Sequence, residues 1–324
     1  MTNQENVKPS EGLVSVVIPT FNRRPLLVKV ISPLLEDPST GEVVIVVDGG
    51  SDGSLEFLRD WARTEPRLRV HYQENAGESA ARRRGIEASR YDIVVILDDD
   101  VEADSGLISA HARWHVNDER LVVLGYMPTV EPSPRRHGLA TTVLYAADYE
   151  STCELYEKDA RSIFTHLWAG NMSMKRASVI DLISQEESGI DQHEDLRFGL
   201  QCQDAGLEAV FDRSLSARHW HSRSLRRFAA DCRRSGRGFA QISRDFPNIA
   251  DQLNPLTSLS TPENLIARYL GSSFVRIFSA PIAMAVSYGS GRVRAWRLET
   301  ISIRVLRLIE TAYAFRRYND VLPE

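Results

Sequence analysis

The feature that most constrains the fold is a series of short apolar runs, rich in β-branched residues, within the first hundred positions. Helix-like segments separate the runs, and runs that are apolar at nearly every position are typical of strands buried on both faces. The pattern therefore predicts an α/β domain with a parallel sheet covered by helices on both sides. The predicted strands are 14–19, 42–48, 68–72 and 93–97, and the predicted helices are 25–35, 55–64 and 78–89.

The rest of the chain is less regular. A further strand is expected at 121–124, a less regular stretch at 126–168 and a helix from near Asp191. Two short strands are expected at 208–211 and 216–220. After residue 224 the chain is predicted to be helical, with interruptions at Gly236, Gly238 and Pro247.

Polar residues follow three of the predicted strands where each ends. The carboxyl ends of parallel strands meet at one edge of a sheet, where ligands bind in open α/β folds. Three carboxylates after residue 97 repel one another unless a cation compensates them, and a divalent metal there can hold a diphosphate. Phe21 is suited to stack on a base and Asp48 to accept a hydrogen bond from it, although Thr20 and Asn22 are equally typical of an ordinary turn. The residues at these three strand ends are Thr20, Phe21, Asn22, Asp48, Asp98, Asp99 and Asp100, of which all but Phe21 are polar.

Composition excludes several classes of protein. The 324 residues are 43% hydrophobic and 26% charged, as in a soluble globular protein, and a net charge of −5 provides no general attraction to nucleic acid. Three distant cysteines, Cys153, Cys202 and Cys232, suggest neither a zinc site nor disulfides, which favours a reducing, cytoplasmic location. Residues 1–11 are polar, lack a signal-peptide core and are expected to be disordered. The uncharged run at 277–291 is too short for a membrane span.

Four motifs together resemble the family 2 glycosyltransferases of the GT-A fold, in order and spacing, over residues 14–130. They are Pro19-Thr20-Phe21-Asn22-Arg23, Val46-Val47-Asp48-Gly49-Gly50-Ser51-Asp52-Gly53-Ser54, Asn75-Ala76-Gly77 with Ala81-Arg82, and Leu97-Asp98-Asp99-Asp100. The resemblance implies a nucleotide-diphospho-sugar donor, a hydroxyl acceptor, a divalent metal (Mn²⁺ or Mg²⁺) and inversion at the anomeric carbon. It predicts a GT-A domain over 12–222, with a nucleotide-sugar half at 12–130 and an acceptor-side half at 131–222, and then a helical extension over 223–324.

The resemblance also implies roles for individual residues. Donor-binding positions are Pro19, Thr20, Phe21, Asn22, Asp48, Arg82, Asp98 and Asp99, and metal-binding positions are Asp100 and Asp98. Two departures stand out. The loop after Asp48 is one residue shorter than is usual in the family, and Arg83 replaces the usual asparagine.

An inverting transfer needs a carboxylate that takes the proton of the acceptor hydroxyl. The pair Glu194 and Asp195 looks like the family's acidic motif at a helix start, and Asp195 is the predicted base. The local sequence pattern alone favours another interpretation, in which Asp191 and Glu194 form a capping box. The position of the pair after Gly170 and Asn171 favours catalysis, and the two interpretations are compatible.

Four further side chains have more than one interpretation. His219 and His221 share a face if the segment is a strand, and relatives place a metal-binding histidine near His219; the alternative is a buried, hydrogen-bonded histidine. Trp168 either supports a sugar ring or packs in the core. Arg223 either reaches the diphosphate or lies on a solvated helix face.

The basic C-terminal helices suggest packing, association or membrane contact. Leu225, Phe228, Ala229 and Cys232 form an apolar stripe, and 293–317 mixes apolar residues with arginine in a similar way. Such stripes suit ordinary packing, a homodimer interface or a peripheral contact with an anionic membrane at its inner face.

The favoured function is transfer from a UDP-sugar in glycan, glycolipid or other glycoconjugate biosynthesis. The alternatives are a sugar nucleotidyltransferase, which normally has a glycine-rich loop after its first strand, and a non-catalytic scaffold that binds sugar nucleotides. A dehydrogenase is disfavoured because no GxGxxG motif follows the first strand.

Overall fold

The computed structural model describes residues 12–116, 118–131, 139–184, 193–254, 273–292 and 296–321. The chain divides into two compact units, residues 1–130, 150–188 and 198–220 in the first, and 131–149, 189–197 and 221–324 in the second. The predicted disordered segment, 1–11, lies outside the described residues. The predicted domain boundary after residue 222 stays a prediction.

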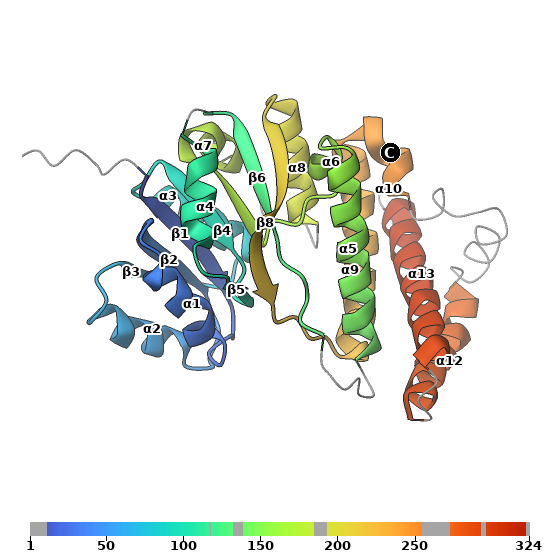
Figure 1. Cartoon of the computed structure of the whole chain (residues 1–324). Helices are drawn as coiled ribbons and strands as arrows, with labels where there is room; N and C mark the ends of the chain where they lie inside the picture. The colour runs from blue at the N-terminus through green and yellow to red at the C-terminus, as the bar shows by residue number, and fades with distance from the viewer. Residues whose placement is uncertain are drawn as a thin grey trace, which may run out of the picture. The chain divides into compact units, whose positions relative to one another are not determined.

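The first unit is built on an eight-stranded sheet with the order β3-β2-β1-β4-β7-β6-β8-β5 (Figure 1). Its strands are β1 (Val14–Thr20), β2 (Thr40–Asp48), β3 (Leu68–Gln73), β4 (Ile93–Leu97), β5 (Val101–Ala103), β6 (Leu121–Tyr126), β7 (Asn171–Lys175) and β8 (Glu208–His219). The four strands predicted in the first hundred residues and the strand near 121 are confirmed.

The sheet is mostly parallel, as predicted. Strands β3, β2, β1 and β4 run parallel to one another, and β8 runs parallel to β6. Strand β7 lies antiparallel between β4 and β6, and the short β5 pairs antiparallel with β8. Every residue of β1 is buried, which requires cover on both faces of the sheet.

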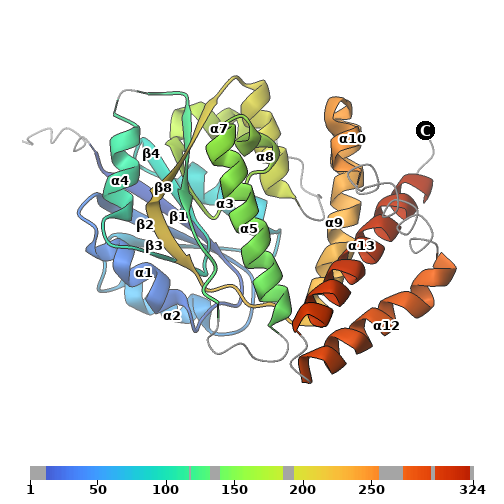
Figure 2. The same cartoon turned by 45° about the vertical axis from the view of Figure 1, so that its right-hand side comes forward.

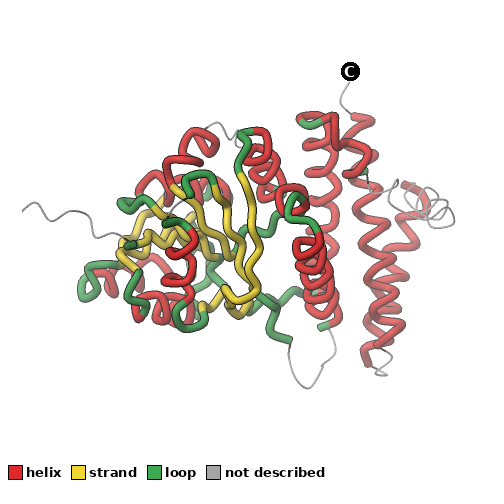
Figure 3. Tube along the Cα trace, turned by 45° about the horizontal axis from the view of Figure 1, so that its top comes forward, coloured by secondary structure: helices red, strands yellow, loops and turns green. Residues whose placement is uncertain are grey.

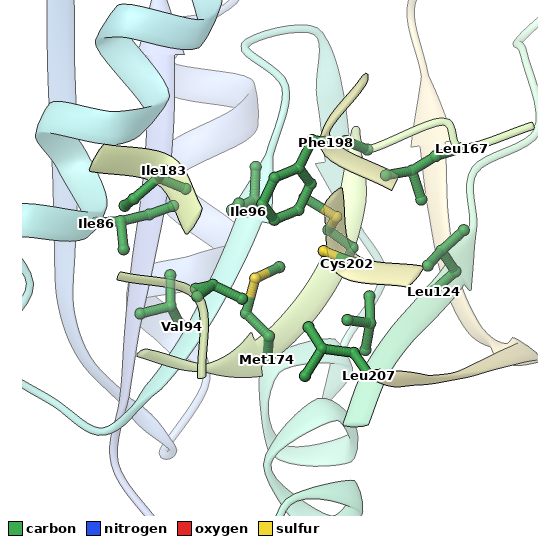
Figure 4. Close-up of a cluster of buried hydrophobic side chains, with 14 of the residues drawn as sticks. Ile86, Val94, Ile96, Leu124, Leu167, Met174, Ile183, Phe198, Cys202 and Leu207 are labelled. Atoms are coloured by element: carbon green, nitrogen blue, oxygen red, sulfur yellow. The ribbon is translucent and has the colours of Figure 1, made fainter. Parts of the chain in front are cut away.

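Helices flank the strands of this unit (Figure 3). They are α1 (Leu27–Glu36), α2 (Ser54–Ala62), α3 (Glu78–Ala88), α4 (Leu107–Trp114), α6 (Ser162–Thr165) and α7 (Arg176–Ser184), together with parts of α5 (Ala140–Lys158) and α8 (Glu194–Asp204). Helix α3 packs against β1 and β2 beside α7, whereas α4 packs on β4 and β8. Figure 4 shows the cluster on the α3 side, where Ile86, Val94, Ile96, Met174 and Phe198 interdigitate.

Two local predictions are wrong. The stretch 126–168, expected to be less regular, contains the 19-residue helix α5. The two short strands predicted after 208 are one strand, β8, with a register shift opposite Gly125. At that irregularity the backbone N–H and the hydroxyl of Ser214 both donate to Asp212 Oδ1, so a local turn is accommodated without ending the strand.

The second unit is mainly helical, as predicted, with α9 (Leu225–Asp245), a 3₁₀ turn η1 (Pro247–Ile249), α10 (Ala250–Leu253), α12 (Ser273–Arg292) and α13 (Trp296–Val321). Helix α9 continues through Gly236 and Gly238, so the predicted interruptions there are wrong. A Cβ at Gly236 would lie 2.3 Å from the carbonyl oxygen of Thr311. This glycine therefore permits the close approach of α13 rather than ending the helix.

The predicted apolar stripe of α9 packs inside this unit. Phe228, Ala229 and Cys232 are buried against Ile303, Leu306 and Ile309 of α13 in one cluster. Ordinary packing therefore accounts for this stripe. Among the described residues, no helix combines the length and the apolar character that crossing a membrane requires.

Candidate active site

The three consecutive carboxylates follow β4 directly, and the pairing of β5 with β8 sets the position of the third. Val101 of β5 is paired with His219 of β8, and the backbone N–H of Trp220 donates to the carbonyl oxygen of Asp100. As a result, Asp100 Oδ1 lies 3.0 Å from His219 Nε2, and both residues are almost fully buried. The sheet thus joins two site residues that are far apart in the sequence.

Arg23 supplies positive charge to the same carboxylates. Its Nη2 donates to Asp100 Oδ2 at 2.9 Å, and its Nε lies 3.2 Å from Asp99 Oδ1. Two adjacent carboxylates, one buried and one only 13% exposed, are unfavourable without such compensation. Sequence reasoning placed Arg23 in the first motif but gave it no role.

Asp99 is held by the loop that follows β1. The backbone N–H of Phe21 donates to Asp99 Oδ2 at 3.2 Å. Burial raises the pKa of Asp99 to about 7; the charge of Arg23 opposes this rise, and that of Asp100 adds to it. The cluster therefore favours a bound cation, which would stabilise the ionised forms of both carboxyl groups.

The donor set at this edge of the sheet suits a divalent metal. Asp100, His219 and His221, which follows β8 by two residues, each offer one ligand atom, and these atoms all lie within 4.8 Å of one another. One carboxylate oxygen and two imidazole nitrogens are a donor set that a divalent transition metal accepts. Asp98 does not belong to this group within the described chain, so its predicted metal contact stays a prediction.

The carboxylate of Asp98 lies close to Gly170 instead. A Cβ at Gly170 would meet Asp98 Oδ2 at 2.3 Å and Met127 Sδ at 2.9 Å. The backbone N–H of Asp98 donates to the carbonyl oxygen of Gly170 at 3.2 Å. The segment before β7 therefore needs a residue without a side chain here. Trp168, two residues earlier, is half-buried, and neither of its predicted roles is tested.

The loops after β1 and β2 are joined by Asn22. Its side-chain Oδ1 accepts a hydrogen bond from the backbone N–H of Ser51 at 3.0 Å, and its own φ is +54°. Asparagine tolerates this left-handed conformation better than most residues. Gly50, with a φ of +96°, leaves only 2.5 Å between a hypothetical Cβ and Asn22 Oδ1. The shortened loop thus depends on its glycine to pack against Asn22.

Asp48 organises the loop that leads into α3. Its Oδ1 accepts from Gln73 Nε2 at 2.8 Å and from the N–H of Ala76 at 2.9 Å, and its Oδ2 accepts from the N–H of Gly77 at 2.9 Å. These bonds position the start of α3, the helix that carries Arg82. The predicted contact of Asp48 with a nucleotide base stays a prediction.

The remaining donor-side residues differ in exposure. Pro19 and Thr20 are buried at the end of β1, whereas Phe21 is exposed, at 46% for the whole residue. Arg82 is buried in α3 and pairs with Glu78 at 2.8 Å.

A buried polar network braces the strands beside the carboxylates, and the sequence did not reveal it. His111 Nδ1 lies 2.8 Å from Ser173 Oγ, His115 Nε2 lies 2.7 Å from the same oxygen, and His111 Nε2 lies 3.0 Å from Asn171 Oδ1. Asn171 Nδ2 donates to the carbonyl oxygen of Leu215, so the amide oxygen of Asn171 accepts from His111. The hydroxyl of Ser173 then donates to His111 Nδ1 and accepts from His115.

Burial sets the protonation state of this network. It lowers the pKa of both His111 and His115 to about 4, and the positive charge of Lys175 adds to the effect at His115. Both imidazoles are therefore neutral at physiological pH. The helical spacing of the two histidines, i and i+4, was the available signal, but nothing in the sequence identified Ser173 as their partner.

The second unit contains the predicted base. Glu194 and Asp195 are the first two described residues of α8, where acids interact favourably with the helix dipole. Asp191 of the predicted capping box lies outside the described residues. The roles of Glu194 and Asp195 stay predictions.

A strained residue precedes the two acids. His193 has a φ of +74°, its Nε2 lies 2.7 Å from Ser235 Oγ, and its ring stacks on Phe239 with centroids 4.0 Å apart. Burial lowers the pKa of His193 to about 4. A non-glycine residue in this conformation is unfavourable by roughly 1–3 kcal/mol, and such strain clusters at functional sites. Contacts with α9 hold the backbone of His193 in place immediately before Glu194.

Arg223 has partners within the second unit. Its Nη1 lies 3.2 Å from Asp231 Oδ2, and its guanidinium lies 5.4 Å from the centre of the Tyr145 ring. His221 stacks on the same ring, with centroids 4.0 Å apart. The predicted contact of Arg223 with a diphosphate stays a prediction.

An open α/β sheet with carboxylates and imidazoles at its carboxyl edge is the architecture of a nucleotide-sugar transferase of the GT-A type. Comparison with known proteins agrees with this class. The family description "Glycosyl transferase family 2" matches residues 15–182, more than half of the chain. The chain therefore belongs to glycosyltransferase family 2, and the predicted enzyme class and fold class are confirmed.

Individual relatives match over a shorter segment. The chain is 36% identical over 96 residues to an uncharacterized glycosyltransferase of Bacillus subtilis, EpsJ, covering 29% of this chain and 28% of that protein. It is also 36% identical over 96 residues, 28% of this chain and 29% of the relative, to an undecaprenyl-phosphate 4-deoxy-4-formamido-L-arabinose transferase of Aeromonas hydrophila. The matched segment thus spans less than a third of each relative.

The fold itself matches over nearly the whole chain. A mannosyltransferase of Pyrobaculum calidifontis, PcManGT, solved with GDP-Man and Mn²⁺, superposes with a TM-score of 0.58 at 18% identity, covering 92% of this chain and 86% of that one. At this identity the likeness establishes the fold alone.

Proposed function

We propose that this family 2 glycosyltransferase moves a sugar from a nucleotide-diphosphate donor, with a UDP-sugar as first choice, to a hydroxyl acceptor, with inversion and with the help of a divalent metal. One observation carries the proposal. The carboxylate of Asp100 lies between His219 and Arg23 at the carboxyl edge of the sheet, directly after Asp98 and Asp99.

The metal would be held by Asp100 and His219, with His221 as a third candidate and Asp98 as the family's alternative. When bound, it supplies a Lewis acid for the diphosphate leaving group. Mn²⁺ and Mg²⁺ both suit a carboxylate, and the two imidazoles favour Mn²⁺. The Mn²⁺ recorded with PcManGT supports the same choice.

The chain's other residues would bind and orient the donor. Phe21 would stack on the base and Asp48 would accept from it, while Asn22 would keep the two loops together. Pro19 and Thr20 would line the base pocket, and Arg82, Asp98, Asp99, Trp168 and Arg223 would contact the ribose, diphosphate or sugar. The family match over residues 15–182, which contains all of these residues except Arg223, supports the assignment.

Asp195 would act as the base, and Glu194 would support it at the helix start. The acceptor oxygen would lose its proton to the Asp195 carboxylate while it forms a bond to the anomeric carbon. The bond between that carbon and the diphosphate oxygen would break, and its electron pair would leave with the diphosphate. The strained His193 beside the pair supports this assignment.

The acceptor would be a lipid-linked or glycan hydroxyl; the name of the Aeromonas relative, an undecaprenyl-phosphate transferase, supports only the lipid carrier. The three cysteines are all free and buried, which supports a reducing, cytoplasmic location. Neither nucleic acid nor a second enzyme class has support from the described site. A homodimer through the C-terminal helices is the alternative to a peripheral contact of these helices with a membrane.

The proposal is tested by donor binding and turnover. A thermal-shift screen of UDP-, GDP- and dTDP-sugars with and without Mn²⁺ should show one metal-dependent stabilisation, because a ligand of the folded state raises Tm. D100A should lose that stabilisation, whereas D104A, four positions along, should keep it. Donor hydrolysis without pyrophosphate release would exclude the nucleotidyltransferase, and turnover by any route would exclude the non-catalytic scaffold.

Asp195 is tested separately from the metal. D195N should lower kcat at least about a hundredfold with little change in donor binding, by the usual scale of general-base effects. D204N changes an exposed acid at the other end of α8 and should retain activity. Wild-type turnover by D195N would refute its role, and metal-independent turnover by D100A would refute the metal site.

A further inference from the structure

Among the side chains that the structure describes on α12, those at 277–278 and 281–289, the exposed ones carry no charge. Its exposed positions extend around one half of the helix and include four side chains that are more than half exposed, Ile277 (63%), Phe278 (58%), Ile282 (60%) and Tyr288 (51%). Val286, Pro281, Ala285 and Gly289 complete this face. By contrast, the exposed side of α9 in the same unit carries arginines.

Helix α13 extends this apolar surface. Leu298, Ile301 and Val305, at positions i, i+3 and i+7, are 55%, 56% and 37% exposed. Three other residues of this helix, Ile303, Leu306 and Ile309, are buried in the cluster that includes residues of α9. Helix α12 packs along α13 (Figure 2), so the exposed residues of both helices belong to one helical pair. We call them the α12–α13 face.

Most of the large apolar side chains exposed on the described chain lie on this face. The others, such as Val28 and Trp114, are scattered over the first unit. Scattered exposed apolar residues are normal. By contrast, such a concentration of exposed apolar side chains on one helical pair is typical of a surface that binds another molecule or a membrane.

The charges bordering the face identify that partner. Arg297 and Arg304 are exposed on α13, whereas the two acids among the described side chains at 277–317, Glu299 and Glu310, are 1% and 2% exposed. Glu310 forms an ion pair with Arg233, with 3.0 Å between Glu310 Oε2 and Arg233 Nη1. The surroundings of the apolar face are thus cationic, without an exposed carboxylate among these residues.

We infer that the α12–α13 face docks on an anionic lipid bilayer. An amphipathic helix with a basic border lies in the plane of the interface, where its apolar side chains enter the boundary between headgroups and acyl chains. Anionic headgroups attract arginines at that border. A second copy of the chain fits less well, because an isologous contact would bring these arginines together without acids to pair with them. The inference concerns binding to lipid and does not depend on the proposed transfer reaction.

The test is flotation of the full chain with vesicles of phosphatidylcholine, with and without phosphatidylglycerol, in the absence of donor. Binding is expected to anionic vesicles and should weaken with salt, because exposed charges are screened within about 8 Å at physiological ionic strength. The double variant I282E/V286E should lose at least roughly tenfold in partitioning, because it places charge in the buried part of the contact. The double variant R297E/R304E should lose the part of the vesicle binding that is sensitive to salt.

The matched control is V28E, which puts a glutamate at a valine that is 49% exposed on α1. It should float like the wild type, and melting curves of every variant check that the fold is intact. Failure of the wild type to float with anionic vesicles would overturn the inference, as would wild-type flotation of both sets of variants. Equal binding to neutral vesicles would overturn the anionic requirement. A concentration-dependent dimer that I282E/V286E abolishes would assign the face to a second copy.

Discussion

Acid should destabilise this enzyme through its buried histidines, and the effect can be worked out for His115. The pKa of His115 is lowered from an ordinary value of 6.5 to about 4. A group with a lowered pKa in the folded protein contributes its full stability above the unfolded value. That contribution disappears as the pH falls from 6.5 toward 4, because the unfolded chain binds the proton first. At pH 5 the loss is about 2 kcal/mol for this histidine alone.

The perturbation is H115Q. Glutamine keeps an N–H donor near the position of Nε2, which lies 2.7 Å from Ser173 Oγ, but it does not titrate. His111 has a pKa lowered to the same value, so the wild type should lose about 4 kcal/mol from the pair between pH 7.5 and 5. The free energy of unfolding of H115Q should fall by about half as much over the same pH range, because one of the two histidines of this network no longer titrates.

The assay is urea denaturation at pH 7.5 and 5, with free energies of unfolding from linear extrapolation. H166Q removes an exposed histidine and serves as the control that keeps the wild-type difference. An equal loss of stability in the wild type and H115Q would refute the reasoning. It would mean that the neutral state of His115 does not matter for stability.

Two further changes test the carboxylate cluster. G170A places a Cβ 2.3 Å from Asp98 Oδ2 and should weaken donor binding at least about tenfold in calorimetry by displacing that carboxylate, whereas G289A meets nothing within 4 Å and should not. Unchanged affinity in G170A would show that Asp98 does not contact the donor. R23Q removes the cation beside Asp99 and Asp100, so Mn²⁺ without nucleotide should raise its Tm by more than in the wild type. R63Q, at a largely exposed position, is the control, and equal shifts would contradict the compensating role of Arg23.

The order of strands and helices in the first hundred residues could be predicted because it depends on local pattern. Continuous apolar runs such as 93–97 are compatible with only a few folds, and the acids that follow such a run must lie at the edge of the sheet. The family motifs added the enzyme class, because each one lies at a strand end or a loop. Helix α9 shows the limit of this reasoning. From the sequence, Gly236 is expected to interrupt the helix, but in the structure it allows the close approach of α13.

The sequence by itself determined the α/β class, the edge at which the carboxylates lie and membership of the family. Only the tertiary structure decided which side chains meet there. The antiparallel pairing of β5 with β8 brings His219 to Asp100, and that of β7 with β4 brings Ser173 between His111 and His115. Local propensity acts over a few residues, whereas these contacts depend on strand pairing across long stretches of chain. These contacts stabilise the protein only once the whole sheet has formed, so they cannot be inferred from a short segment of the sequence.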